Sequence, residues 1–335
     1  MVNIDTLKKE LQATARKIKD GYVMSNFEKT EFALSCGFLF DMVGYDFDLL
    51  VALKRMTLPI EEMDKTIMIC KEFTDVIKHR LFEILFNTDI DEGLLDEKNI
   101  YCRDDLKTEI LKFYKGFDRK HYKLIRELVF DNERFKIIPY AEISCYDMDR
   151  RSACSAHFNN KSYVYIATGK SHYPGPLGPY QMFAKTATIH ELGHVISFSY
   201  SDKHKNLETA FREVIPYTAE FAYLNTNNDK VESAKEYFLT INTLTRILGI
   251  LSQKEYAPAE EKNYYYIVGE SIGLYLSYLY TNDTIKFRRY YDFLKENMYI
   301  EEDKMISVFL NDKDFLRMDY LKKDISTNEK ILLKA

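Results

Sequence analysis

The sequence FAKTATIHELGHVISF, residues 183–198, is the part of the chain that most restricts the folds it can adopt. The segment is mostly apolar and long enough to predict a largely buried helix. His190 and His194 are four residues apart in it, so on a helix their side chains lie on the same face, about one turn apart. The two imidazoles can therefore bind one metal ion.

Residues 190–194, HELGH, match the HExxH pattern of zinc sites that are built on a helix. In this pattern the two histidines bind the metal, and the glutamate, here Glu191, stands beside it without binding. A carboxylate placed there can take a proton from water and later pass it to a leaving amine. The alternative is a helix with two hydrogen-bonded core histidines. The motif predicts two zinc ligands and one general base.

A third ligand is expected downstream, because catalytic zinc takes three protein ligands and keeps one position open. Residues 208–220 contain three glutamates. Glu213 is the predicted ligand, and Glu220 follows it by seven residues, two helical turns along the same face. We expect Glu220 to stand behind the site and hold a histidine Nδ1 or a water. Glu208 is interpreted as an exposed helix residue.

The amino-acid composition is that of a globular protein and argues against nucleic-acid and membrane partners. The 335 residues are 46% hydrophobic and 14% aromatic, which is enough for a large core in one or two domains. A net charge of −5 argues against a nucleic-acid partner. We expect no membrane partner and a cytoplasmic location, because residues 1–9 lack a signal-peptide core and no apolar run approaches the roughly 18 residues that cross a bilayer.

The order of sequence patterns predicts a mainly α fold with a small β-sheet. Helical periodicity runs from residue 4 to about 130, so residues 1–134 are predicted to form an N-terminal helical region. Residues 135–335 are predicted to form the catalytic region. It opens with runs rich in β-branched and aromatic residues up to Ala167, which indicate the sheet. Residues 169–180 contain three glycines and three prolines and predict a loop that walls or covers the site.

The chain resembles the thimet oligopeptidase and oligoendopeptidase F family of zinc peptidases. Four segments carry the resemblance: HELGH at 190–194, EVIPYTAE at 213–220, RRSACS at 150–155 followed by SYVYI at 162–166, and NYYYIVGESIG at 263–273. The resemblance implies a zincin-like catalytic core in a helical body that encloses a deep channel. It also implies one zinc ion per chain and short, unfolded peptides as substrates.

The resemblance also implies roles for residues outside the motif. Tyr264 and Tyr266 match tyrosines that bind the substrate oxyanion, although the same residues also fit an aromatic core stripe. Ser155, His157 and Tyr163 match the segment and edge strand along which the family lays its substrate. His157 also fits a loop-capping role. The chain departs from the family in being shorter and in having no histidine in residues 252–263.

These patterns predict a zinc metallopeptidase that hydrolyses short peptides with Glu191 as its general base. A thermolysin-like peptidase is a second possibility, but that pattern expects an aspartate where Tyr217 stands. A peptide-binding or scaffold protein that keeps a metal for stability is a third. Glu191 argues against the third possibility, because a structural site gains nothing from a base. General peptide turnover and maturation of one peptide both fit the motifs.

Overall fold

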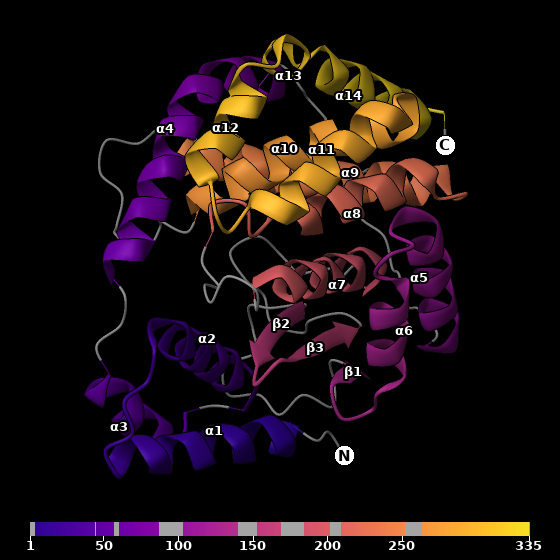
Figure 1. Cartoon of the computed structure of the whole chain (residues 1–335). Coiled ribbons are helices and arrows are strands. Elements are labelled where there is room, and N and C mark those ends of the chain that lie inside the picture. The colour runs from indigo at the N-terminus through magenta and orange to yellow at the C-terminus, as the bar shows by residue number, and fades with distance from the viewer. Residues whose placement is uncertain are drawn as a thin grey trace. The chain divides into compact units, whose positions relative to one another are not determined.

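The computed structural model describes residues 4–43, 45–56, 60–86, 103–139, 153–168, 184–201, 209–251 and 263–334. Helices make up most of this part of the chain, and three strands form one small mixed sheet (Figure 1). The prediction of a mainly α fold with a small sheet is therefore confirmed. The predicted loop at 169–180 lies outside the described residues.

The chain divides into two compact units, each made of two chain segments. The first unit contains Met1–Ile60 and Lys98–Leu207, and the second contains Glu61–Glu97 and Glu208–Ala335. The N-terminal helices thus share a unit with the sheet and with the helix that carries HELGH. The predicted division into regions 1–134 and 135–335 stays a prediction.

The first unit is built around the sheet. Its helices are α1 (Ile4–Lys19), α2 (Asn26–Val43), α3 (Phe47–Arg55), α5 (Arg103–Phe117), α6 (Tyr122–Phe130) and α7 (Ala184–Ser201), and its strands are β1 (Phe135–Pro139), β2 (Ala153–Phe158) and β3 (Lys161–Thr168). The central strand is β3, which runs parallel to β1 and antiparallel to β2. A two-residue turn joins β2 to β3, and both of its residues, Asn159 and Asn160, have positive φ, as tight hairpin turns require.

The strand order corrects one expectation. Residues 162–166 were expected to match an edge strand, but they lie in β3, which is paired on both sides. Its backbone hydrogen-bonding groups are therefore occupied by β1 and β2. The sequence pattern identified a strand correctly but could not identify its neighbours, because β1 comes from a distant segment.

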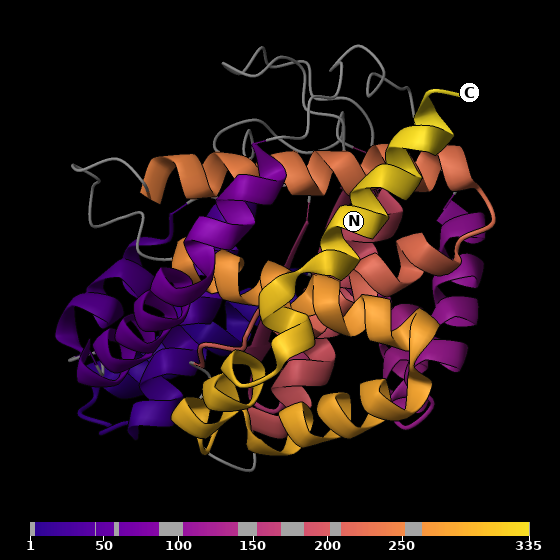
Figure 2. The same ribbon diagram turned by 90° about the horizontal axis from the view of Figure 1, so that it is seen from above.

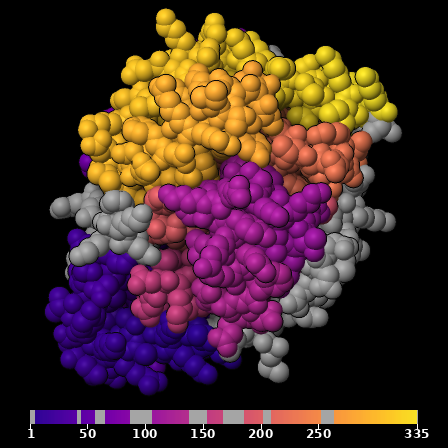
Figure 3. All heavy atoms as spheres, turned by 45° about the vertical axis from the view of Figure 1, so that its right-hand side comes forward, coloured from indigo at the N-terminus to yellow at the C-terminus, as the bar shows by residue number. Residues whose placement is uncertain are grey.

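Helices cover both faces of this sheet. On one face, α1 and α2 share an apolar cluster with Cys154, Ala156, Phe158, Tyr163 and Tyr165. On the other face α7 packs against β2 and β3 (Figure 1). Alternate residues of a strand point to opposite faces, so β2 contributes to both contacts. Beside the sheet, α5 and α6 form one continuous stretch of the surface of this unit (magenta in Figure 3).

The second unit is a stack of helices. Its members are α4 (Ile60–Leu85), α8 (Val214–Thr226), α9 (Lys230–Leu251), α10 (Asn263–Asn282), α11 (Thr284–Asn297), α12 (Glu302–Leu310), α13 (Lys313–Arg317) and α14 (Asp319–Leu332). Every residue of α8 from Val214 to Leu224 is buried, and α10 is buried almost as completely. Helices that are apolar on all sides belong in the middle of a protein. On the outside of the unit, α14 crosses α9 (Figure 2).

Among the residues that the structure describes, no helix has both the length and the apolar composition needed to cross a membrane.

Candidate metal centre

The segment with the HELGH motif forms α7, which confirms the predicted helix from Ala184 onward. Its inward side is apolar, with Ile189, Leu192, Val195 and Ile196 buried. The Tyr114 hydroxyl of α5 donates a hydrogen bond of 2.6 Å to the Ile189 carbonyl oxygen, directly before the motif. Burial raises the pKa of the Tyr114 phenol well above its usual range, so the hydroxyl stays a neutral donor. Packing and this hydrogen bond together hold α7 against its neighbours.

The two histidine rings lie side by side on α7. Their centroids are 5.1 Å apart and their planes are inclined by 74°. His194 also stacks on Phe198, one turn further along, with a centroid distance of 6.0 Å. Phe198 in turn contacts His157 of β2, with a centroid distance of 5.4 Å. The sheet therefore supports one of the two motif histidines through an aromatic ring.

Glu213 stands at the N-cap position of α8 and is 4% exposed. Two hydrogen bonds to residues far along the chain hold the turn before it. The Thr209 hydroxyl donates to the Met298 carbonyl oxygen at 2.5 Å. The Ala210 N–H donates to the Glu302 carboxylate at 2.9 Å. Burial raises the pKa of Glu302. The backbone that carries Glu213 is thus attached to the end of α11 and the start of α12, which follow far along the chain.

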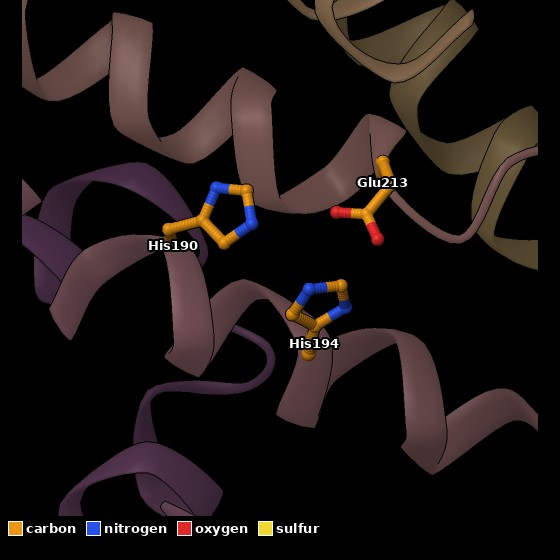
Figure 4. A group of neighbouring side chains, drawn as sticks. All are labelled: His190, His194 and Glu213. Atoms are coloured by element: carbon orange, nitrogen blue, oxygen red, sulfur yellow. The ribbon is translucent and has the colours of Figure 1, made fainter. Parts of the chain in front are cut away.

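The side chains of His190, His194 and Glu213 converge (Figure 4). One ligand atom from each lies within 4.8 Å of the corresponding atoms of the other two. Figure 4 shows both imidazole rings on α7 and the carboxylate pointing toward one another. Two imidazole nitrogens and one carboxylate oxygen form a donor set found in catalytic zinc sites. This group can hold a metal ion, and its members are the three ligands expected from the sequence.

Glu191, the predicted general base, is 8% exposed. It follows His190 directly on α7 and is not one of the three residues whose ligand atoms converge. This arrangement is the one expected of a base that stands beside a metal without binding it. The catalytic role of Glu191 stays a prediction.

Glu220 lies two turns after Glu213 on α8 and is also buried. Its carboxylate accepts a hydrogen bond of 3.1 Å from the Thr240 hydroxyl of α9. The structure therefore ties this side chain to α9, a partner that the sequence did not suggest. The predicted contact of Glu220 with a histidine Nδ1 or a water stays a prediction.

The tyrosines at the start of α10 have different surroundings. Tyr264 lies under the Lys71 ammonium of α4, 5.6 Å from the ring centroid. Tyr266 lies near Tyr217 of α8. Burial raises the pKa of Tyr217 well above its usual range. Nearby ionisable groups raise this pKa further, in decreasing order Glu270, Glu220, Glu213 and Tyr266. Tyr266 therefore lies near α8, whereas Tyr264 packs against α4. Their predicted binding of an oxyanion is not tested by these contacts.

The three predicted substrate-binding residues of the sheet do not share a face. Tyr163 belongs to the cluster under α1 and α2, and its hydroxyl is 3.5 Å from the Glu10 carboxylate. In the strand register, Ser155 and His157 alternate with the residues of that cluster and therefore face α7. His157 is buried, and its Nδ1 is 3.1 Å from the Ser162 hydroxyl. The structure thus separates Tyr163 from the other two.

Sequence reasoning missed Arg212 and Tyr265. The Arg212 Nε is 3.3 Å from a Glu213 carboxylate oxygen, and its guanidinium lies over the Tyr265 ring at 5.3 Å. Arg212 could have been noticed because it directly precedes the predicted ligand. Tyr265 could not, because only the packing of α10 near α8 brings it to this place.

Comparisons with known proteins leave the family open. No protein-family model and no curated protein sequence matches the chain. Among solved structures, the chain is similar to that of a putative peptidase from Chlamydophila abortus, with 12% sequence identity and a TM-score of 0.47. The match covers 97% of this chain and 64% of that chain, so this chain spans less than two thirds of the protein it matches. The resemblance to the oligopeptidase family therefore stays a prediction.

Proposed function

We propose that the protein is a zinc-dependent metallopeptidase that hydrolyses short, unfolded peptides. The observation that supports this most is the convergence of His190, His194 and Glu213, whose ligand atoms lie within 4.8 Å of one another. This donor set suits zinc, and it leaves a coordination position for a reactant because it supplies three ligands and not four. A zinc ion bound there would supply Lewis-acid chemistry that activates water and polarises a carbonyl group.

Glu191 would move the proton in this reaction. Its carboxylate takes a proton from the water whose oxygen attacks the scissile carbonyl carbon. When the carbon–nitrogen bond breaks, the same carboxylate returns the proton to the leaving nitrogen. The products are a carboxylic acid and an amine, which exchange a proton to become a carboxylate and an ammonium group. Because Glu191 is 8% exposed, little bulk water competes for this proton.

Tyr266 is our leading candidate for a hydrogen-bond donor to the oxyanion, and Tyr264 is the second. A phenol hydroxyl can donate to the developing negative charge, and removing one such donor typically costs about 3 kcal/mol of transition-state stabilisation. The position of Tyr266 near Tyr217 favours it over Tyr264. Tyr266→Phe should therefore lower kcat more than it raises KM.

The proposal is tested by comparing Glu191→Gln with Glu213→Ala on a mixed pool of short peptides. Glu191→Gln should keep its zinc and lose about 10²- to 10⁴-fold in turnover, because only proton transfer is removed. Glu213→Ala should lose zinc as well as turnover. Zinc content is measured by mass spectrometry of the metal, and products are mapped by mass spectrometry of the peptides.

The control is Glu127→Gln, which removes an exposed carboxylate of α6 and should leave turnover unchanged. Full activity in Glu191→Gln would exclude the proposed mechanism. A scaffold protein that keeps a metal for stability would instead show no peptide products at any zinc concentration, and chelation would lower its melting temperature. The peptide pool, with and without chelator, therefore separates the two functions.

A further inference from the structure

Two glycines bring the backbones of α10 and α8 into direct contact. Gly269 and Gly273 are one turn apart on α10, and they face Glu213 and Tyr217, which are also one turn apart. A Cβ atom at position 269 would lie 2.3 Å from the Glu213 Cβ, 2.9 Å from its carbonyl carbon and 3.1 Å from its Cα. A Cβ atom at position 273 would lie 2.6 Å from the Tyr217 Cβ. Neither position has room for a side chain.

Three other helical glycines that the structure describes, Gly37, Gly116 and Gly249, have no such contact. A Cβ atom at Gly249 of α9 would meet nothing within 4 Å. Glycine in a helix interior costs about 1 kcal/mol relative to alanine, so Gly249 only weakens its helix. At Gly269 the same cost is accompanied by a close approach to one particular residue. That residue is the proposed metal ligand.

The contact at Gly269 cannot be relieved by rotating a side chain. Two of the three close atoms of Glu213 are backbone atoms, and the third is its Cβ. Because carbon atoms in contact are about 3.5 Å apart, alanine at position 269 would push the Glu213 backbone away by roughly 1 Å. The preceding turn is held by Met298 and Glu302, so it resists that movement.

A metal site is more sensitive to such a shift than a hydrophobic core is. Ligand distances in protein metal sites vary by only about 0.2 Å around their usual values. A displacement several times larger would pull the Glu213 carboxylate out of its place beside the two histidines. A core residue displaced by the same amount would lose packing energy but could repack with its neighbours.

We propose that Gly269 is a positioning residue for the metal centre: by bringing the backbone of α10 against Glu213, it sets where that carboxylate stands. Gly273 makes the same kind of contact one turn further along, with Tyr217, which is not a proposed ligand. This inference rests on the proposed metal site. The pair Gly269 and Gly273 offers a matched comparison, because both alanine variants disturb the same helix pair.

The test measures zinc affinity and stability of the full chain in Gly269→Ala, Gly273→Ala and Gly249→Ala. Zinc affinity is obtained by competition with a chromophoric chelator, and the absorption spectrum of bound Co²⁺ reports the coordination geometry. Gly269→Ala should weaken zinc binding by about 10- to 100-fold, the range found when residues that hold a ligand are changed, and should alter the Co²⁺ spectrum. Gly273→Ala should lower the melting temperature to a similar degree and weaken zinc binding much less. Gly249→Ala should change neither zinc binding nor the spectrum.

Equal losses of zinc affinity in Gly269→Ala and Gly273→Ala would overturn the inference, because Gly269 would then act only on stability. If Gly269→Ala does not fold, Glu213→Asp decides. That variant keeps the contact with Gly269 but shortens the ligand by one methylene, so a fixed backbone predicts a large loss of zinc affinity. Unchanged affinity in Glu213→Asp would show that the backbone adapts and would overturn the inference. Failure of the unaltered protein to bind zinc would reject the proposed function itself.

Discussion

The two segments that carry the proposed metal ligands are held in place in different ways. His190 and His194 belong to one continuous helix, α7, so helical geometry alone sets the distance between them. Glu213 belongs to a turn before α8, and the shape of that turn depends on hydrogen bonds to Met298 and Glu302. One half of the donor set is therefore local in sequence, and the other half depends on contacts between distant segments.

This difference predicts which substitutions should weaken metal binding. Changes around α7 should cost stability while leaving the spacing of the two histidines intact, because the hydrogen bonds of the helix maintain it. Changes around the turn should move Glu213 and weaken metal binding directly. Three substitutions test the contrast, beginning with the one that should have the largest effect, and a fourth, in α14, tests the stability of the second unit.

Glu302→Ala removes the carboxylate that accepts the Ala210 N–H at 2.9 Å. A buried donor without its charged acceptor costs about 3 kcal/mol, and we expect that loss in the free energy of unfolding, measured by urea denaturation. Because the turn leads to Glu213, zinc affinity should also fall by about 10-fold or more.

Glu302→Gln is the matched variant, since its amide oxygen can still accept this hydrogen bond. It should keep most of the zinc affinity that Glu302→Ala loses. Unchanged zinc affinity in Glu302→Ala would contradict the inference that distant segments position Glu213, because the turn would then hold Glu213 without help from α12.

Asp324 of α14 should make the stability of the second unit depend on pH. Burial raises the pKa of its carboxyl to about 7, against the opposing effect of Lys323. Below about pH 4 the Asp324 carboxyl is protonated in both the folded and the unfolded state. As the pH rises to about 7, the unfolded chain loses the proton from this carboxyl first, so the folded state becomes less stable relative to it. This group therefore stabilises the fold least above pH 7. Asp324→Asn removes the effect and should raise the free energy of unfolding by about 2 kcal/mol at pH 8.

The same variant compares the stabilities of the two units. Its gain in stability should vanish near pH 4, where the wild-type carboxyl is neutral, and the unfolding of the second unit should respond more than that of the first. Hydrogen exchange of α9 and α14, compared with exchange of β3, measures this difference. Equal gains at pH 4 and pH 8 would show that folding does not raise the pKa of Asp324.

The same contrast explains how much of the fold could be predicted from sequence. The helix at 183–198 and the strand at 162–166 could be predicted because their patterns are local. The position of that strand in the centre of the sheet could not, because it depends on pairing with residues 135–139 and 153–158. Register and strand order are properties of the assembled sheet, and a single strand does not encode them.

The candidate site follows the same rule. The spacing of His190, Glu191 and His194 carries the chemistry in five residues, and Glu213 could be found because its position after the motif resembles a known pattern. Gly269 and Glu302, which hold Glu213 in place, could not be recognised. Neither residue type signals a role at the metal centre, and only tertiary packing brings them to the ligand.

Tyr114→Phe tests whether α7 is as independent as we infer. The variant deletes the hydroxyl that donates to the Ile189 carbonyl oxygen at 2.6 Å and keeps the buried ring. The free energy of unfolding should fall by about 1 kcal/mol, the usual contribution of one hydrogen bond. Zinc affinity should stay within about twofold, because the backbone of α7 holds both histidines. A loss as large as that in Glu302→Ala would mean that α5 also positions the ligands.

Phe198→Leu should have the smallest effect when the changes are expressed as free energies, and it reveals how much the aromatic support of His194 contributes. Phe198 stacks on His194 at 6.0 Å and contacts His157 at 5.4 Å, and such ring pairs contribute about 0.5 to 1.5 kcal/mol. Only part of that energy favours the ring orientation that binds metal, so zinc affinity should fall by about threefold. Phe293→Leu, a change on the exposed side of α11, is the control and should have no effect on zinc. If Phe198→Leu instead reduced zinc affinity as strongly as Glu302→Ala, the helix would not position its histidines alone, and both ligand segments would depend on distant contacts.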